Sequence, residues 1–115
     1  MKKAVLFAFN GELMCFVHVL LNAIDMNEKG YEVKIVIEGS ATKLVAELAK
    51  EGSPMSTLYK KVKSLDLIDG ACKACSNKMG TLEAVRAEGL KLLDDMNGHP
   101  GMAYYMEQGF EVITF

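Results

Sequence analysis

The chain has 115 residues, half of them hydrophobic and 24% charged, and its formal net charge is −2. This length suits one hydrophobic core, so we expect residues 1–115 to form a single domain. The slightly acidic balance argues against the basic surface with which proteins bind nucleic acid. Eight methionines and a high apolar fraction suggest an interface between subunits.

The cysteine content and the start of the chain indicate the compartment. Three cysteines are too few, and odd in number, for a disulfide framework. Free thiols persist in a reducing environment, so we expect a cytoplasmic protein. Lys2 and Lys3 precede an apolar run, as in a secretory signal, but the polar turn at residues 10–12 interrupts that run and no small-residue cleavage site follows. The longest apolar stretch is too short for a membrane span, so no membrane contact is expected.

The first half of the chain alternates apolar runs with helical patterns. Ala4–Phe9 is continuously apolar, which predicts a strand buried on both faces. Leu13–Asn27 has apolar residues at helical spacing, over an arc wider than one sheet face requires, so this helix is expected to contact a partner subunit as well. The next expected elements are a strand at Val33–Ile37 and helices at about Ala41–Lys50 and Met55–Val62.

The third predicted strand, Leu67–Cys72, ends at a cysteine. In α/β folds, the carboxyl end of such a strand is where ligands bind. Cys75 follows three residues later, with Lys73 and Lys78 nearby. Backbone N–H groups and lysines around a thiol favour its thiolate, which is the better nucleophile at neutral pH.

The segment after Cys72 is expected to be a loop that ends at Gly80, with Thr81 capping the next helix. The remaining expected elements are a short strand at Leu90–Leu93, a helix at about Met102–Gln108 and a last strand at Glu111–Phe115. This alternation of strands and helices predicts a parallel sheet with helices on both faces.

The strand-terminal Cys72, the Gly80 eight residues later and the closing strand Glu111–Phe115 resemble the DsrE/TusD family of sulfur-relay proteins (DsrE/DsrF-like). The resemblance spans essentially the whole chain, although its motifs are short. It implies a DsrEFH-like three-layer α/β/α fold with a five-stranded parallel sheet, and a homo-oligomer, commonly a trimer or hexamer. It also implies a cysteine that accepts sulfur as a persulfide, which by spacing is Cys72. The chain departs from the family pattern in having Cys75 and the charged Asp94-Asp95 segment.

Two functions are therefore considered. The first is a sulfur carrier or sulfurtransferase that takes persulfide sulfur from a donor protein and passes it to an acceptor protein, with Cys72 and Cys75 as catalytic residues. The second is a non-catalytic oligomeric module of the same fold that binds a small ligand or a partner, with cysteines that simply pack. Neither requires a cofactor.

Cys75 has three interpretations. It is a redox partner that forms a disulfide with Cys72, a metal ligand beside Cys72 with His99 as a third ligand, or a bystander on the first helical turn. One C-x-x-C pair is only half of a structural zinc site, so the metal interpretation is the least favoured and no metal is expected.

Asn10, Gly11, Lys73 and His99 are the candidate substrate-binding residues. Asn10 and Gly11 follow the first strand at the sheet edge where Cys72 is expected, although a plain turn explains them equally well. His99 lies in a glycine- and proline-containing loop from which a side chain can reach a cleft, or it is an ordinary surface histidine. His18 lies in the apolar arc of the first helix, and we expect it to be buried.

Overall fold

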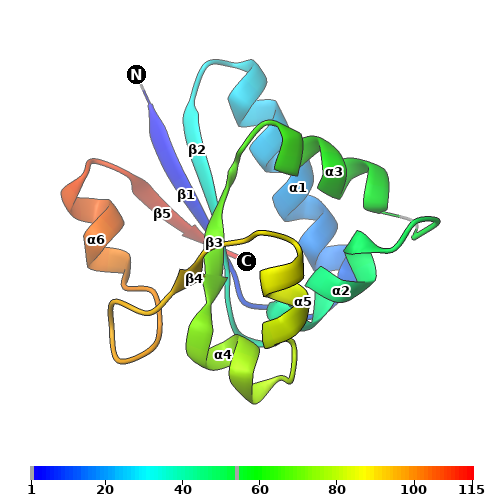
Figure 1. Ribbon diagram of the computed structural model, residues 1–115. Coiled ribbons are helices and arrows are strands. Elements are labelled where there is room, and N and C mark those ends of the chain that lie inside the picture. The colour runs from blue at the N-terminus through cyan, green and yellow to red at the C-terminus, as the bar shows by residue number, and fades with distance from the viewer. Residues whose placement is uncertain (1, 54) are drawn as a thin grey trace.

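The computed structural model describes residues 2–53 and 55–115 and contains a five-stranded parallel sheet (Figure 1). The strand order is β4-β3-β2-β1-β5, and each neighbouring pair is parallel. The strands are β1 (Lys3–Ala8), β2 (Glu32–Ile37), β3 (Ile68–Cys72), β4 (Leu92–Leu93) and β5 (Glu111–Thr114). These five strands confirm the predicted α/β class with a five-stranded parallel sheet.

Helices cover both faces of this sheet. They are α1 (Leu13–Glu28), α2 (Leu44–Ala49), α3 (Ser56–Ser64), α4 (Lys73–Lys78), α5 (Leu82–Ala87) and α6 (Met102–Glu107), with a 3₁₀ turn η1 (Gly39–Lys43) before α2. Figure 1 shows α6 on one side of the sheet and α1, α2 and α3 on the other, which gives the three layers of an α/β/α fold. Among the described residues, no helix combines the length and the apolar character that crossing a bilayer requires.

Strand β1, which lies between β2 and β5, is buried on both faces, as its apolar run predicts. Val5, Leu6 and Phe7 are each 0% exposed. Leu6 packs in the larger core cluster, which also contains α1 residues such as Phe16. Val5 and Phe7 point to the opposite face and pack in a second cluster with Tyr105 of α6. Because successive side chains of a strand alternate between faces, a strand covered on both sides needs an uninterrupted apolar sequence.

The sheet register aligns the carboxyl ends of the middle strands. Ala8 of β1 lies beside Ile37 of β2, and Ile37 lies beside Ala71 of β3. Cys72 in turn lies beside Leu93 of β4. The residues that follow β2, β3 and β4 therefore emerge at one edge of the sheet.

The predicted helix at Leu13–Asn27 is confirmed and extends by one residue to Glu28. It ends before Gly30, whose φ of +86° is a left-handed conformation that glycine adopts without strain. The prediction that His18 is buried is wrong, because this side chain is exposed. Phe16, Val19 and Leu20 fill the inner side of the helix and leave His18 on its outer side.

The predicted loop after Cys72 is also wrong, because β3 passes directly into the helix α4. Cys72 is the N-cap of this helix, and its Sγ accepts a hydrogen bond from the Cys75 backbone N–H at 3.3 Å. A sulfur atom thus performs the capping task that an oxygen side chain usually performs. Thr81 precedes α5 as predicted but does not cap it; its Oγ1 donates to the Ser76 carbonyl oxygen at 3.4 Å instead.

We expect Gly70→Ala to destabilise the fold by about 1–3 kcal/mol, the usual cost of overpacking. A Cβ at Gly70 would lie 2.5 Å from the Lys91 carbonyl oxygen and 2.8 Å from Leu93 Cγ, so β4 would have to move away from β3. Guanidinium unfolding followed by circular dichroism measures this cost. An unchanged midpoint would show that β4 does not need its close approach to β3.

Candidate functional site

Four side chains of types that bind metals or perform acid–base and thiol chemistry converge at the carboxyl edge of the sheet. Glu38 follows β2, Cys72 ends β3, Cys75 lies in the first turn of α4, and His99 lies in the loop after β4. One ligand atom from each residue lies within 4.8 Å of the ligand atoms of the other three. The aligned strand ends bring these residues together from segments that are far apart in the sequence.

Cys72 is the most enclosed of the four, with 0% of its surface exposed. Its Sγ lies 3.2 Å from His99 Nδ1, and the Gly98 carbonyl oxygen is 3.8 Å away. The Ser76 hydroxyl donates to the Cys72 carbonyl oxygen at 2.7 Å, which fixes the backbone at the strand-to-helix junction. Burial raises the pKa of the Cys72 thiol well above its usual range, and the side-chain hydrogen bond with Cys75 acts in the same direction.

Cys75 is half-buried, and its Sγ lies 3.6 Å from the same nitrogen, Nδ1 of His99. The imidazole is therefore in contact with both sulfurs. A histidine between two thiols can take a proton from either of them or return it.

The loop that carries His99 is held by backbone hydrogen bonds. The Met96 N–H donates to the His99 carbonyl oxygen at 2.7 Å, and the His99 N–H donates to the Met96 carbonyl oxygen at 2.9 Å. The Gly98 carbonyl oxygen accepts from the Ala74 N–H of α4 at 2.8 Å. These bonds join the loop to the helix that carries Cys75, so the ring and the thiols are parts of one local structure.

Glu38 is a carboxyl group that sequence reasoning missed. It is only 6% exposed, and burial raises its pKa above the usual range, although the nearby His99 acts in the opposite direction. None of the ion pairs found among the described residues includes Glu38. The signal that could have found it is positional, because Glu38 directly follows a strand that lies next to the strand ending at Cys72.

The candidate site residues identified from the sequence divide into two groups. Cys72, Cys75 and His99 meet in one cluster. Asn10 and Gly11 form a turn, in which Asn10 Oδ1 accepts from the Glu12 N–H at 2.8 Å and the Gly11 N–H donates to Ser40 Oγ at 2.9 Å.

Lys73, like Asn10 and Gly11, makes its contact outside the cluster, because its Nζ pairs with Asp94 at 3.6 Å. Lys78, the other lysine near the thiols in sequence, is exposed. The sequence suggested that the positive charge of Lys73 supports a Cys72 thiolate. In the structure, the carboxylate of Asp94 balances that charge instead.

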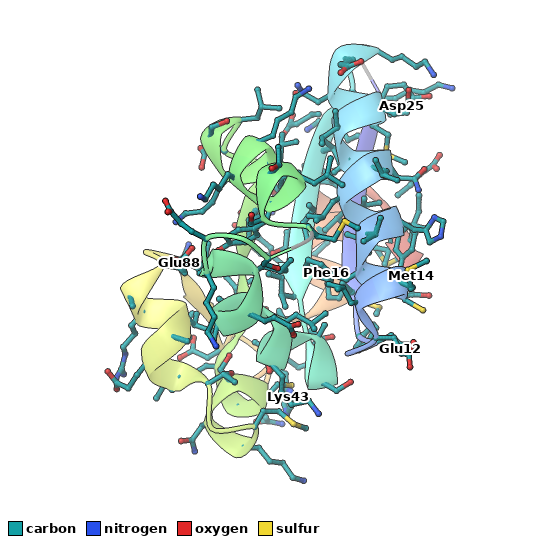
Figure 2. All side chains as sticks on the ribbon, turned by 90° about the vertical axis from the view of Figure 1, so that its right-hand side faces the viewer. Glu12, Met14, Phe16, Asp25, Lys43 and Glu88 are labelled. Atoms are coloured by element: carbon teal, nitrogen blue, oxygen red, sulfur yellow. The ribbon has the colours of Figure 1, made fainter. Side chains whose placement is uncertain are left out.

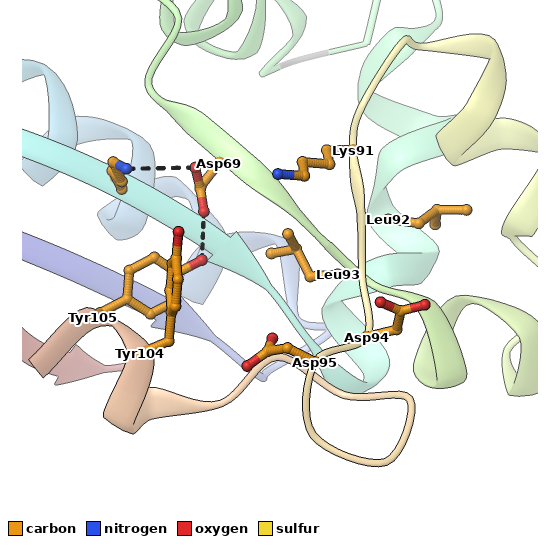
Figure 3. Close-up of a pocket in the computed structure, with 9 residues that line it drawn as sticks. Asp69, Lys91, Leu92, Leu93, Asp94, Asp95, Tyr104 and Tyr105 are labelled. Carbon is orange, nitrogen blue, oxygen red and sulfur yellow. Dashed lines mark hydrogen bonds and ion pairs between the residues drawn. The ribbon is translucent and has the colours of Figure 1, made fainter. Parts of the chain in front are cut away.

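A separate cavity of about 390 Å³ lies beside β3 and β4 and is lined in part by Lys34, Asp69 and Lys91 (Figure 3). The Tyr105 hydroxyl donates to Asp69, and Lys34 Nζ lies 3.7 Å from the same carboxylate. Burial, together with this hydrogen bond, raises the pKa of Tyr105 above its usual range, so the hydroxyl keeps its proton. Charged groups of both signs therefore line part of the cavity.

Comparisons with other proteins give relatives in archaea. The chain is 35% identical over 96 residues to the uncharacterized protein MJ0733 of Methanocaldococcus jannaschii, a match that covers 84% of this chain and 76% of that protein. It is 46% identical over 59 residues to an uncharacterized protein of Archaeoglobus fulgidus, covering 51% of this chain and 95% of that protein. No family model matches the chain.

A solved structure shares the fold. The conserved protein of unknown function BT1422 from Bacteroides thetaiotaomicron superposes with a TM-score of 0.75 over 99% of this chain and 95% of its own. The sequence identity is 17%, so this likeness concerns the arrangement of strands and helices alone.

We expect a small alkylating reagent such as iodoacetamide to modify Cys75 before Cys72 in the native, reduced protein. Cys72 is enclosed, whereas Cys75 is half-buried. Trypsin cleavage after Lys73 separates the two cysteines, so mass spectrometry of the peptides over time measures each one. Unfolding in guanidinium should remove most of the difference; faster native modification of Cys72 would contradict the expected exposure.

Proposed function

The chain belongs to the family of the uncharacterized protein MJ0733 of Methanocaldococcus jannaschii, and we propose that it carries sulfur as a cysteine persulfide at the Cys72–Cys75 pair. This is the activity that the resemblance to DsrE/TusD-like sulfur-relay proteins implies. The observation that carries the proposal is the position of His99 Nδ1, 3.2 Å from one sulfur and 3.6 Å from the other. This geometry suits proton transfer between an imidazole and a thiol.

In our proposal Cys75 accepts the sulfur, because it is the more accessible of the two thiols. Cys75 gives its proton to His99, and the resulting thiolate attacks the outer sulfur of a donor persulfide. A bond forms between Cys75 Sγ and that sulfur while the bond between the two donor sulfurs breaks. The donor leaves as a thiolate and takes the proton back from His99. This assignment differs from the sequence-based expectation, which gave the accepting role to Cys72.

Two routes then remove the sulfur. The thiolate of an acceptor protein attacks the outer sulfur of the Cys75 persulfide, and Cys75 leaves as a thiolate. Alternatively, Cys72 loses its proton and attacks Cys75 Sγ, which forms a Cys72–Cys75 disulfide and releases hydrosulfide. The burial of Cys72 favours the first route, because its thiolate is costly to form. Both routes need thiols that are kept reduced, so we place the activity in the cytoplasm.

Incubation of the reduced, metal-free protein with a persulfide donor should add the mass of one sulfur atom to the tryptic peptide that contains Cys75. Cys75→Ser should lose this species, whereas Cys15→Ser, which changes a thiol outside the cluster, should retain it. Cys72→Ser should still take up sulfur if Cys75 accepts it directly. Sulfur uptake by a variant that lacks both Cys72 and Cys75 would refute the proposal.

The second candidate function, a binding module without catalysis, is favoured by the cavity of about 390 Å³ beside Asp69. Its volume lies within the range of about 300–1,000 Å³ that is usual for small-ligand pockets. Lys91 offers charge to an anionic group, and Tyr105 presents a fixed hydroxyl. Failure of both cysteines to take up sulfur would favour this function.

We also expect a homo-oligomer, either a trimer or a hexamer. On α1, Met14 is 68% exposed and Leu21 is 46% exposed, so large apolar side chains remain on the outside of the helical layer. Figure 2 views this layer from outside and labels Met14 and Phe16 on α1. Burial of such side chains against a second copy would remove apolar surface from water.

Sedimentation at micromolar concentration should therefore give a mass above that of the 12.6 kDa chain. The double substitution Met14→Lys and Leu21→Lys should shift the protein towards monomers, because two charges cannot be buried cheaply in an apolar contact. His18→Lys, at an exposed position of the same helix, is a control for added charge. A wild-type monomer would contradict this expectation.

A further inference from the structure

We propose that Glu38, Cys72, Cys75 and His99 form a binding site for a thiophilic divalent cation, zinc above all. The sequence pattern makes metal binding the least favoured role, because it contains one C-x-x-C pair and does not single out Glu38. Metal binding does not depend on the proposed sulfur chemistry, because the reduced protein would bind the ion with the same side chains in the absence of a sulfur donor.

The two sulfur–nitrogen distances fit a tetrahedral zinc site. With Zn–S bonds of about 2.3 Å and Zn–N bonds of about 2.0–2.1 Å, a tetrahedral angle places sulfur and nitrogen about 3.5 Å apart. His99 Nδ1 lies 3.2 Å from Cys72 Sγ and 3.6 Å from Cys75 Sγ, on either side of this value. The Glu38 carboxylate completes a set in which all ligand atoms lie within 4.8 Å of one another. The four ligand atoms are therefore close enough for side-chain rotations to bring them onto one ion.

The scaffold fixes the backbone of two of the four ligands, Cys72 and His99, before any ion binds. Cys72 is fixed by the junction of β3 and α4, where the Ser76 hydroxyl donates to its carbonyl oxygen. His99 is fixed by its reciprocal backbone hydrogen bonds with Met96. In a ring that binds metal through Nδ1, Nε2 carries the proton. Such preorganisation reduces the ordering cost of binding.

The charges of the cluster also favour a cation. Once both thiols have lost their protons, Cys72, Cys75 and the Glu38 carboxylate would carry three negative charges in a largely buried place. Buried charges are normally paired or bound to metals, and no ion pair found within residues 2–53 and 55–115 includes Glu38. The nearby Lys73 pairs with Asp94 instead. A divalent ion would neutralise two of the charges, and the two thiol protons would pass to solvent as the Zn–S bonds form.

The donor types select the class of metal. Two sulfurs, one imidazole nitrogen and one carboxylate oxygen suit zinc and similar ions, whereas magnesium and calcium prefer sites made of oxygen ligands. Four protein ligands fill a tetrahedral zinc sphere, so the site would be closed to water and substrate. A bound ion would also occupy both thiols and prevent them from accepting sulfur while it remains.

Cobalt(II) is a suitable probe, because it occupies zinc sites and its absorption reports the ligands. Titration of the reduced, metal-free protein with cobalt chloride should saturate at one ion per chain. It should give strong visible bands of a tetrahedral ion and a near-ultraviolet thiolate-to-cobalt transition. Zinc should then displace the cobalt and remove both signals. A pale spectrum without thiolate transitions would refute the proposal on the wild-type protein alone.

Variants test three of the four ligands. Cys75→Ser and His99→Ala should each weaken zinc binding by about 100-fold or more. Loss of a residue that only hydrogen-bonds to a metal ligand typically weakens binding by about 10–100-fold, and loss of the ligand itself should cost at least as much. Glu38→Gln should keep the thiolate transition but weaken binding and alter the visible bands. Cys15→Ser is the matched control, because this thiol lies on α1 outside the cluster. A Glu38→Gln variant identical to wild type, or a loss with Cys15→Ser equal to that with Cys75→Ser, would overturn the four-ligand site.

The metal and sulfur proposals can fail separately. Cobalt absorption is measured without a sulfur donor, and sulfur uptake is measured by mass on metal-free protein. Cobalt binding without sulfur uptake would leave the metal site standing and remove the sulfur carrier. Sulfur uptake without cobalt binding would support the sulfur carrier and refute the metal site. Circular dichroism of each variant separates loss of a ligand from loss of the fold.

Discussion

The burial of β1 on both faces is the constraint on which the rest of the structure depends. A strand covered on both sides lies inside a sheet, and its neighbours β2 and β5 run parallel to it. Parallel neighbours cannot be joined by tight turns, so each connection crosses over a face of the sheet as a helical segment. These crossovers return the chain to the same end of the sheet each time, and the residues after successive strands gather at the opposite edge. The cluster of Glu38, Cys72 and His99 is a direct product of that geometry.

The burial that stabilises the sheet also determines what Cys72 can do. An enclosed thiol keeps its proton, because its anion would lose hydration. The N–H of Cys75 partly offsets this cost by donating to the sulfur. Cys75 is only half-buried, so its thiol is open to reagents that cannot reach Cys72. Two cysteines three residues apart therefore differ in the reactions that they can undergo. His99 is the group that connects the two environments, since it contacts both sulfurs.

The sequence predicts best those parts of the fold in which the hydropathy pattern is repeated over several residues. The apolar run of β1 and the long stripe of α1 each repeat their signal over several residues. The segment Lys73–Lys78 does not, because it is short and contains Ser76 and Asn77, which favour turns, so α4 was missed. Glu38 carries no local signal, since a single glutamate after a strand is ordinary until the neighbouring strand is known. His18 was misplaced because a wide apolar arc does not reveal which of its margins faces solvent.

The position of the cluster along the chain has a consequence for folding. Glu38 and His99 are brought together only after β2, β3 and β4 have all paired, and such long-range pairing forms slowly compared with local helices. Before that stage, Cys72 and Cys75 lack the enclosure that the paired strands provide, so oxidants and stray metal ions can reach both thiols. The four-residue cluster therefore forms only when the sheet is nearly complete. Protection of the Cys72 thiol from solvent would report that β2, β3 and β4 have paired.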